Sequence, residues 1–286
     1  MLPEPLSPSL SSPRRPAGLA PSRTLRAKLL REVHALGLPT GPTGPERVDP
    51  VTEADLASLP ETAQRYLRFM AVLGRPRTWS VRARSGGLFR LGPKQAWMPC
   101  EVWQYDTCLD VARIFLMRLR LRGVLPMLVR DTYVRGEGRM RGRVLDAVSV
   151  VDQSDEKIAI GELVTFVNDA VMWAPSMLLT DAVRWTAVDD RSFDVALTDR
   201  GRTVSARVFV KSDGELVDFS TTDRFGPDPA QPGEMVRARW STPVNGFRTF
   251  GGRPVAASGA AIWHFASGDL KYADFTVEDL DFDVSP

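Results

Sequence analysis

Acid–base chemistry is indicated most clearly by one short segment, residues 129–134, which alternates in polarity like a strand. The alternation puts Asp131 on the same face as the apolar Val129 and the aromatic Tyr133. A carboxylate among such neighbours must be paired, hydrogen-bonded or exposed to a cavity, because desolvating it alone is costly. Two interpretations therefore stand: a salt bridge to an arginine of a neighbouring strand, or an acid or base with a raised pKa on a cavity wall.

Two further residues complete the candidate catalytic set. Glu162 is expected to open a helix that covers the sheet, where a carboxylate either does acid–base chemistry or simply interacts with the helix dipole. Histidine suits proton transfer near neutral pH, although a single strand histidine such as His264 is usually structural. The chain has only one other histidine, His34, so we predict no metal site. A Ser-His-Asp site is possible only through His264. The candidate catalytic residues are Asp131, Tyr133, Glu162 and His264.

Glycine-rich segments do not indicate a cofactor. Residues 136–142 resemble a dinucleotide-binding motif with one residue too many, but strand periodicity continues on both sides, where the motif needs a helix. A bulge or tight hairpin explains these glycines better. Residues 87–94 resemble a phosphate loop but place Pro93 where the motif needs lysine. We therefore predict no cofactor.

Arginines are the strongest charge feature of the middle of the chain. Arg118, Arg120 and Arg122 alternate along one strand face, which suits either a cationic strip for phosphates and acidic head groups or a solvated sheet face or edge. The second interpretation is favoured, because no aromatic side chains interleave on that face. The formal net charge is only +2, from 37 basic and 35 acidic residues, so we predict no nucleic-acid partner.

Composition describes an ordinary globular chain of 286 residues, 43% of them hydrophobic. Its two cysteines, Cys100 and Cys108, fit neither a disulfide framework nor a common zinc spacing, so a reducing cytoplasm is predicted. No apolar run approaches the roughly 20 residues of a membrane-spanning helix. Residues 1–21 are rich in proline and serine and are expected to be a disordered leader.

Periodicity separates helices from strands along residues 22–286, which we interpret as a single domain. Helical spacing predicts helices over 22–37, 52–74 and 160–180. From Thr78 the period changes to two, and roughly seven strand-like segments precede Asp152. More strands with hairpin signals follow the third helix. This segregated order predicts an α+β fold with a large antiparallel sheet.

Several segments together resemble a bacterial family of uncharacterised proteins over about residues 59–281. They are residues 87–90, 96–99, 104–105, 131–140, 161–163, 173–179 and 183–190, with Trp240, Gly252 and Trp263. The resemblance implies an architecture similar to the lipoprotein-carrier (LolA-like) fold, a curved half-barrel of antiparallel strands covered by N-terminal helices and a mid-chain helical insert. It implies little about activity, because the family's function is unknown.

A curved sheet covered by apolar helices leaves a cavity suited to a small molecule. We therefore expect a binder of a hydrophobic or lipid-like molecule, of unknown oligomeric state. The predicted lining residues are Trp97, Trp103, Gln104, Trp173, Trp185 and Trp240. The alternative is a cofactor-independent enzyme, such as a cyclase or isomerase, acting on a hydrophobic intermediate. A third possibility is an interaction module that uses the arginine strip.

Overall fold

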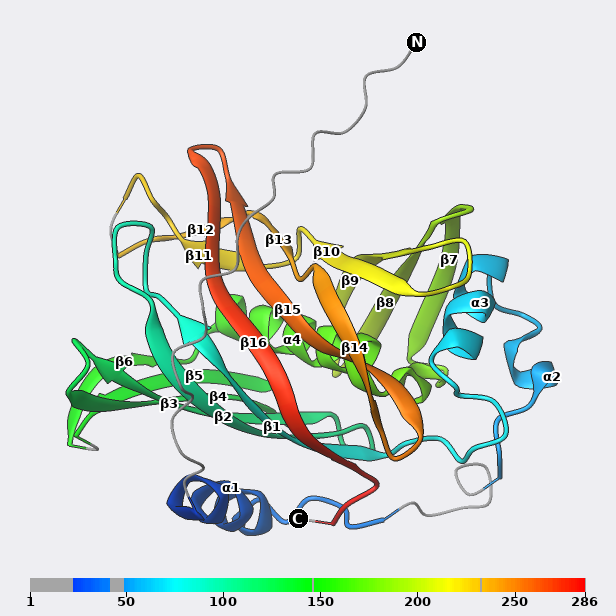
Figure 1. The fold of residues 1–286 in the computed structure, drawn as a ribbon, viewed down its shortest axis with the longest axis horizontal. Helices are drawn as coiled ribbons and strands as arrows, with labels where there is room; N and C mark the ends of the chain where they lie inside the picture. The colour runs from blue at the N-terminus through cyan, green and yellow to red at the C-terminus, as the bar shows by residue number, and fades with distance from the viewer. Residues whose placement is uncertain (1–22, 42–48, 146, 232, 286) are drawn as a thin grey trace.

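The alternating segments after residue 78 form antiparallel strands in the computed structural model, which describes residues 23–41, 49–145, 147–231 and 233–285. Within these residues, one 14-stranded sheet accompanies a separate two-stranded ribbon (Figure 1). The sheet contains β1 (Ser80–Phe89), β2 (Met98–Thr107), β3 (Ala112–Leu121), β4 (Leu125–Val134), β5 (Glu137–Val144), β6 (Val148–Gln153), β7 (Val183–Asp189), β8 (Ser192–Asp199), β9 (Arg202–Val210), β10 (Leu216–Thr221), β13 (Arg239–Ser241), β14 (Val244–Phe250), β15 (Arg253–Phe265) and β16 (Gly268–Phe282). The ribbon contains β11 (Phe225–Pro227) and β12 (Met235–Arg237).

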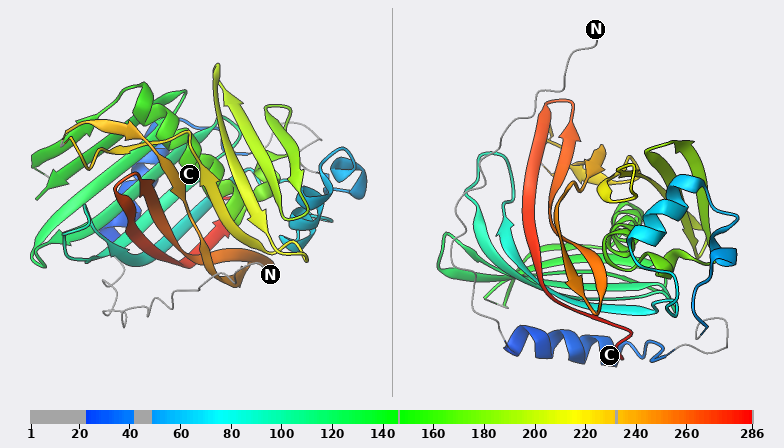
Figure 2. Two further views of the ribbon diagram at one scale, coloured as in Figure 1. Left: turned by 90° about the horizontal axis from the view of Figure 1, so that it is seen from above. Right: turned by 45° about the vertical axis from the view of Figure 1, so that its right-hand side comes forward.

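Strand order shows how the two halves of the sheet are joined. Over the described residues it is β6-β5-β4-β3-β2-β1-β16-β15-β13-β10-β9-β8-β7, with β14 paired to β15. The last strand, β16, pairs with β1 through Val81 and Phe282, and with β15 through Trp263 and Leu270. Strands β6 and β7 are the two outer edges, so the sheet curves but stays open (Figure 2).

Helix α4 (Glu156–Trp173) lies in the hollow of this curved sheet (Figure 2). The side chain of Asp155 caps its N-terminus by accepting a hydrogen bond from the backbone N–H of Ile158 at 2.9 Å. Almost every residue from Ile158 onward is buried, as expected for a helix enclosed by other elements. A short 3₁₀ helix, η2 (Pro175–Leu178), follows.

The N-terminal helices occupy two separate places. Helix α1 (Arg23–Ala35) packs on the outer face of the sheet, where Leu25 and Leu29 join a cluster with residues of β2 and β3. Helices α2 (Glu53–Leu56) and α3 (Glu61–Phe69) lie near the β7 edge (Figure 1). Helix α4 covers the middle of the inner face, and α3 joins the same core near β7 and β8, where the hydroxyl of Tyr66 donates to the carbonyl oxygen of Val171 at 2.5 Å.

The predicted α+β class with a large, curved antiparallel sheet is confirmed. Element bounds differ in places. The helix expected over 52–74 is split, because Pro60 disfavours helical backbone in the residue before it and starts a new helix instead. The helix expected over 160–180 begins earlier, at Glu156, and is α-helical only to Trp173, while six strands rather than seven precede it. The helix expected over 22–37 is seen as α1, and the predicted leader lies outside the described residues.

Candidate functional site

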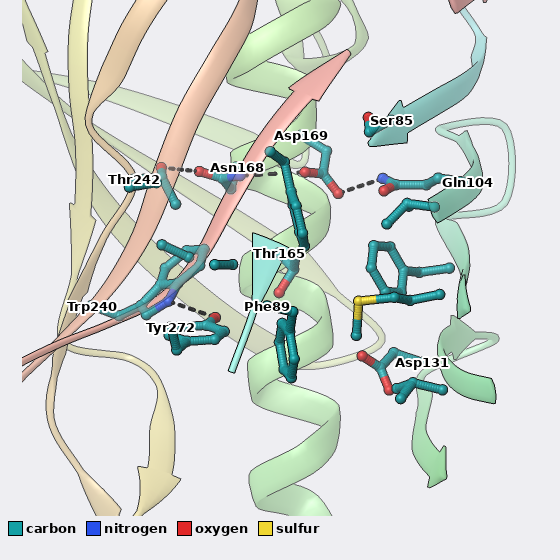
Figure 3. A pocket seen from close by; sticks show the side chains of 18 of the residues that line it. Ser85, Phe89, Gln104, Asp131, Thr165, Asn168, Asp169, Trp240, Thr242 and Tyr272 are labelled. Atoms are coloured by element: carbon teal, nitrogen blue, oxygen red, sulfur yellow. Dashed lines mark hydrogen bonds between the residues drawn. The ribbon is translucent and has the colours of Figure 1, made fainter. Parts of the chain in front are cut away.

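A cavity of about 380 Å³ lies between the inner face of the sheet and helix α4. This volume falls within the range of roughly 300–1,000 Å³ that small-molecule sites occupy. Strands β1 to β6 form one side, β15 and β16 another, and the β11–β12 ribbon contributes to the wall. Most of the lining is apolar, and Figure 3 shows part of it. Its larger apolar side chains include Phe89, Phe115, Met127, Trp173, Trp263 and Phe275.

Asp131 of β4 points into this cavity without a protein partner (Figure 3). Its Oδ1 is shielded from solvent and accepts no hydrogen bond from the described residues. Burial, followed by the nearby charge of Glu162, raises the pKa of Asp131 to about 8, although Arg113 and Arg224 oppose the shift. At neutral pH the carboxyl is therefore mostly protonated. No salt bridge is formed, so of the two interpretations of Asp131 the geometry matches the cavity wall.

A buried ion network forms the polar side of the cavity. The guanidinium of Arg113, on β3, donates to Glu162 Oε2 at 2.8 Å and to Asp169 Oδ2 at 2.8 Å. The side-chain amide of Gln104, on β2, donates to Asp169 Oδ2 at 2.6 Å and to Asp106 Oδ2 at 2.7 Å. Burial and the charge of Asp169 hold the pKa of Asp106 well above its usual range. One arginine thus lies near three carboxyl groups, which is more negative charge than it can neutralise, and this contributes to the raised pKa of Asp106.

Helix α4 connects this network to the opposite wall through a chain of polar side chains (Figure 3). The hydroxyl of Thr242 donates to Asn168 Oδ1 at 2.5 Å, and Asn168 Nδ2 donates to Asp169 Oδ1 at 3.3 Å. Thr165, one turn earlier, donates back to the carbonyl oxygen of Gly161 at 2.8 Å. The polar face of α4 is therefore held in place by both sides of the sheet.

A second cation, Arg224, lies just before the β11–β12 ribbon. Its guanidinium carbon stands 4.0 Å from the ring centroid of Trp240 and 5.5 Å from that of Trp263. Its Nη1 is shielded from solvent yet donates to no described residue. Trp240 is itself oriented by its Nε1, which donates to the hydroxyl of Tyr272 at 3.0 Å. The residues of the cavity wall therefore include one guanidinium nitrogen and one carboxyl oxygen that bond to no described residue.

The profile of DUF6544, a family of unknown function, matches residues 49–275. The chain belongs to this family. The predicted resemblance to an uncharacterised family is thus confirmed. Among solved structures, the chain is similar to a LolA superfamily protein from Nitrosomonas europaea, at 12% identity and a TM-score of 0.40 over 79% of this chain and 93% of that one. A comparison with curated proteins gave no match.

Five of the predicted site residues line the cavity of this DUF6544 protein: Asp131, Glu162, Gln104, Trp173 and Trp240. Glu162 does not open the helix as expected, because α4 begins at Glu156 and places Glu162 beside Arg113 instead of at the helix dipole. Its carboxylate is therefore held by an ion pair and faces the sheet.

Three predicted lining tryptophans lie elsewhere. Trp103 faces the outer side of the sheet with α1, where its Nε1 donates to Glu101 Oε1 at 3.1 Å. Trp185 lies on β7 and packs on Phe193, with ring centroids 5.4 Å apart. Trp97 lies between β1 and β2, where the guanidinium of Arg90 covers its ring at 4.7 Å. None of the three lines the described cavity.

Tyr133 and His264 also lie outside the cavity lining. The hydroxyl of Tyr133 donates to Asp199 Oδ2 at 2.7 Å and ties β4 to the β8–β9 turn. His264 lies between Ser241 Oγ, 2.8 Å from its Nε2, and Asp269 Oδ1, 2.7 Å from its Nδ1. The three residues have the order of a Ser-His-Asp site, but Ser241 is buried and its backbone lies in the ladders to β10 and β15. They join β13, β15 and β16 rather than open to a substrate.

The site residues that were not predicted include Arg113, Asp169, Asn168 and Arg224. Three of these four carry a sequence signal. Arg113 interrupts an otherwise apolar strand, and Asn168 with Asp169 interrupts an apolar helix, which is where buried polar networks occur. Arg224 follows no periodic pattern, because it lies in the segment between β10 and the ribbon.

Two further properties concern the described residues as a whole. They contain no group of histidine, cysteine, aspartate or glutamate side chains arranged to hold a metal ion. They also contain no helix with the length and apolar character needed to cross a membrane. The cytoplasmic location and the absence of a cofactor remain predictions.

Asp131 is expected to make the stability of the protein depend on pH. The carboxyl titrates near pH 4 in the unfolded chain and at about 8 in the folded one, so the folded state binds the extra proton between these values. The free energy of unfolding therefore falls as pH rises from about 4 to 8, by up to about 1.4 kcal/mol per pH unit. This pH dependence is absent in Asp131→Asn. The free energy of unfolding of the variant, relative to that of the wild type, therefore increases as pH rises.

Urea unfolding at pH 5 and pH 8 measures the difference. Asp152→Asn is the control. Arg139 lowers the pKa of the exposed Asp152, so this carboxylate is charged at both pH values and its contribution to stability is the same at each. Parallel pH profiles for the wild type and Asp131→Asn would contradict the assignment of a raised pKa to Asp131.

Proposed function

We propose that the cavity binds a hydrophobic or lipid-like small molecule whose polar group meets Asp131 and Arg224. The observation that carries the proposal is an apolar cavity with only a few polar atoms left without protein partners. Apolar walls favour an apolar guest through the surface they remove from water. Convergent polar groups then fix its orientation.

The hydrogen-bonding capacity of Arg224 Nη1 and of Asp131 limits which polar group the bound molecule can carry. Arg224 Nη1 is a donor, and a protonated Asp131 both donates and accepts. An oxygen acceptor such as a carbonyl or carboxyl satisfies both residues. A fully apolar guest leaves both buried atoms unsatisfied, at a cost of about 1–3 kcal/mol for each.

Binding is tested by native mass spectrometry of the purified protein, solvent extraction of any retained molecule, and titration with a fluorescent fatty acid. Ala261 lines the cavity from β15 opposite the similarly small Ala273, so Ala261→Phe fills part of the space. We expect the affinity for the probe to fall by about ten-fold or more in this variant. Ala187→Phe, on the exposed face of β7, is the matched control. Equal probe binding by all three proteins would show that the probe lies elsewhere.

A second candidate function is favoured by the state of Asp131. A protonated carboxyl beside an apolar cavity is a general acid whose proton is available at neutral pH. In an isomerase or cyclase, Asp131 donates this proton to one atom of a hydrophobic substrate, and its carboxylate recovers a proton from another atom. No cofactor is required for such a step.

Turnover of the retained molecule separates enzyme from binder. If the protein is an enzyme of this kind, Asp131→Asn lowers the rate by about 10²–10⁴-fold while the affinity changes much less. Asp152→Asn, whose exposed side chain does not line the cavity, keeps the wild-type rate. Product formation that is equal in both variants would rule out Asp131 as the acid, and an absence of product from the wild type would leave binding alone as the function.

A further inference from the structure

Exposed apolar side chains gather at the tips of two neighbouring hairpins. Among the described residues, five of the eight large hydrophobic side chains that are exposed lie there, with exposed fractions between 42% and 74%. We call the described residues of these two turns, 120–125, 143–145 and 147–150, the hairpin tips. Their exposed apolar residues are Val124, Leu125, Leu145, Val148 and Val150.

The two tips form one surface. The first is the turn between β3 and β4, and the second is the turn between β5 and β6, at the left in Figure 1. Strands β4 and β5 pair directly, and the backbone N–H of Leu145 donates to the carbonyl oxygen of Pro126 at 2.9 Å. The apolar side chains are therefore held near one another by the sheet itself. An exposed apolar cluster of this kind marks an interaction site.

Arginines without acidic partners accompany the apolar side chains. Arg120, Arg122 and Arg143 are all exposed, and none forms an ion pair with a described residue. The side chain of Arg143 donates only to the carbonyl oxygen of Ala147, at 3.3 Å. This contrasts with other arginines of the same strands, such as Arg139, which pairs with Asp152 at 2.8 Å. Within the described part of the chain, these three cations therefore have no acidic partner.

We propose that the hairpin tips dock on the surface of an anionic lipid bilayer. Arginines pair with lipid phosphates, and the aliphatic side chains enter the boundary between head groups and acyl chains. A bilayer is the partner that matches both features at once. Nucleic acid matches only the arginines, because the tips carry no aromatic side chain on which a base can stack.

The strands that end at the tips also line the cavity. Met127 of β4, Gly142 of β5 and Val151 of β6 contribute to its wall. Docking through the tips therefore brings the wall of the cavity next to the bilayer, where apolar molecules reside. The docking itself does not depend on what the cavity binds, so it is tested separately from the proposed function.

Flotation of the full-length protein with lipid vesicles tests the proposal. We expect binding to vesicles of phosphatidylcholine with 30% phosphatidylglycerol, weaker binding at high salt, and little binding to phosphatidylcholine alone. Each arginine near an anionic surface contributes about a five-fold gain in affinity, so Arg120→Gln/Arg122→Gln/Arg143→Gln is expected to bind about 100-fold more weakly. Val124→Asp is expected to bind at least ten-fold more weakly.

The opposite edge of the sheet supplies matched controls. Arg184→Gln/Arg191→Gln and Val188→Asp change the same residue types on β7 and its turn, where the side chains are also exposed. These variants are expected to float as the wild type does, and all variants should keep the wild-type melting temperature. The proposal is overturned by an absence of flotation, by an equal loss in the controls, or by tip variants that bind normally. Retention on heparin or DNA without flotation overturns it as well.

Discussion

Replacement of Arg113 by methionine is expected to lower the free energy of unfolding by about 3–5 kcal/mol, since removal of one partner leaves buried charges uncompensated. Arg113 is buried and is the cation that holds both Glu162 and Asp169. Without it, the two carboxylates face each other in an apolar site.

Chemical denaturation of the wild type and of Arg113→Met at neutral pH measures the loss in the free energy of unfolding. Arg207→Met is the matched control, because Arg207 forms a similar 2.8 Å pair with Asp194 on the exposed surface. Exposed pairs contribute about 0–1 kcal/mol. In a triple variant, Arg113→Met with Glu162→Gln and Asp169→Asn, part of the loss should be recovered. A loss in Arg113→Met no larger than in the control would show that the network carries little stability.

Replacement of Gly138 by alanine is expected to be the second large effect. Strand β5 passes so close to α4 at Gly138 that a Cβ atom would lie 2.3 Å from Ala159 Cα and 2.5 Å from Ala159 N. Both atoms belong to the helix backbone, so the strand and the helix must separate. Overpacking of this kind costs about 1–3 kcal/mol or more.

Gly161→Ala is the matched control on the other side of the contact. It lies within α4, and the nearest atom to an added Cβ is Arg224 Nε at 3.8 Å, an ordinary contact. Alanine in a helix interior is favoured over glycine by about 0.5–1 kcal/mol, so this variant should be slightly stabilised. In thermal unfolding, the melting temperature is therefore expected to fall in Gly138→Ala and to rise slightly in Gly161→Ala. Equal shifts would show that β5 has room to move away from α4.

Local periodicity predicted much of this structure and one central residue of the site. The segregated order of helices and strands gave the fold class, and alternation within β4 was enough to turn Asp131 toward the hollow of the sheet. Both inferences depend only on the types of residues that are close together in the sequence. The break of the second helix at Pro60 is equally local and was within reach of the same reasoning.

What escaped prediction depends on distant contacts. Gln104 and Trp103 are consecutive on β2, so only one of them can face the cavity, and the choice depends on where α1 packs. The partners of Arg113 lie on α4, about 50 residues further along the chain. Arg224 reaches the cavity because the ribbon folds over it, which no spacing in the sequence indicates.

The position of β16 has a consequence for how the protein is made. This strand lies in the middle of the sheet, between β1 and β15, yet it is synthesised after all the other strands that the structure describes. During translation, Val81 of β1 therefore cannot pair with Phe282, its partner across the β1–β16 ladder, until β16 has been synthesised. Until then, the first half of the sheet keeps β1 as an unpaired edge, open to pairing with another nascent chain. Such distant pairing also makes folding slow, so the yield of soluble protein should depend on chaperones that shield β1 during translation.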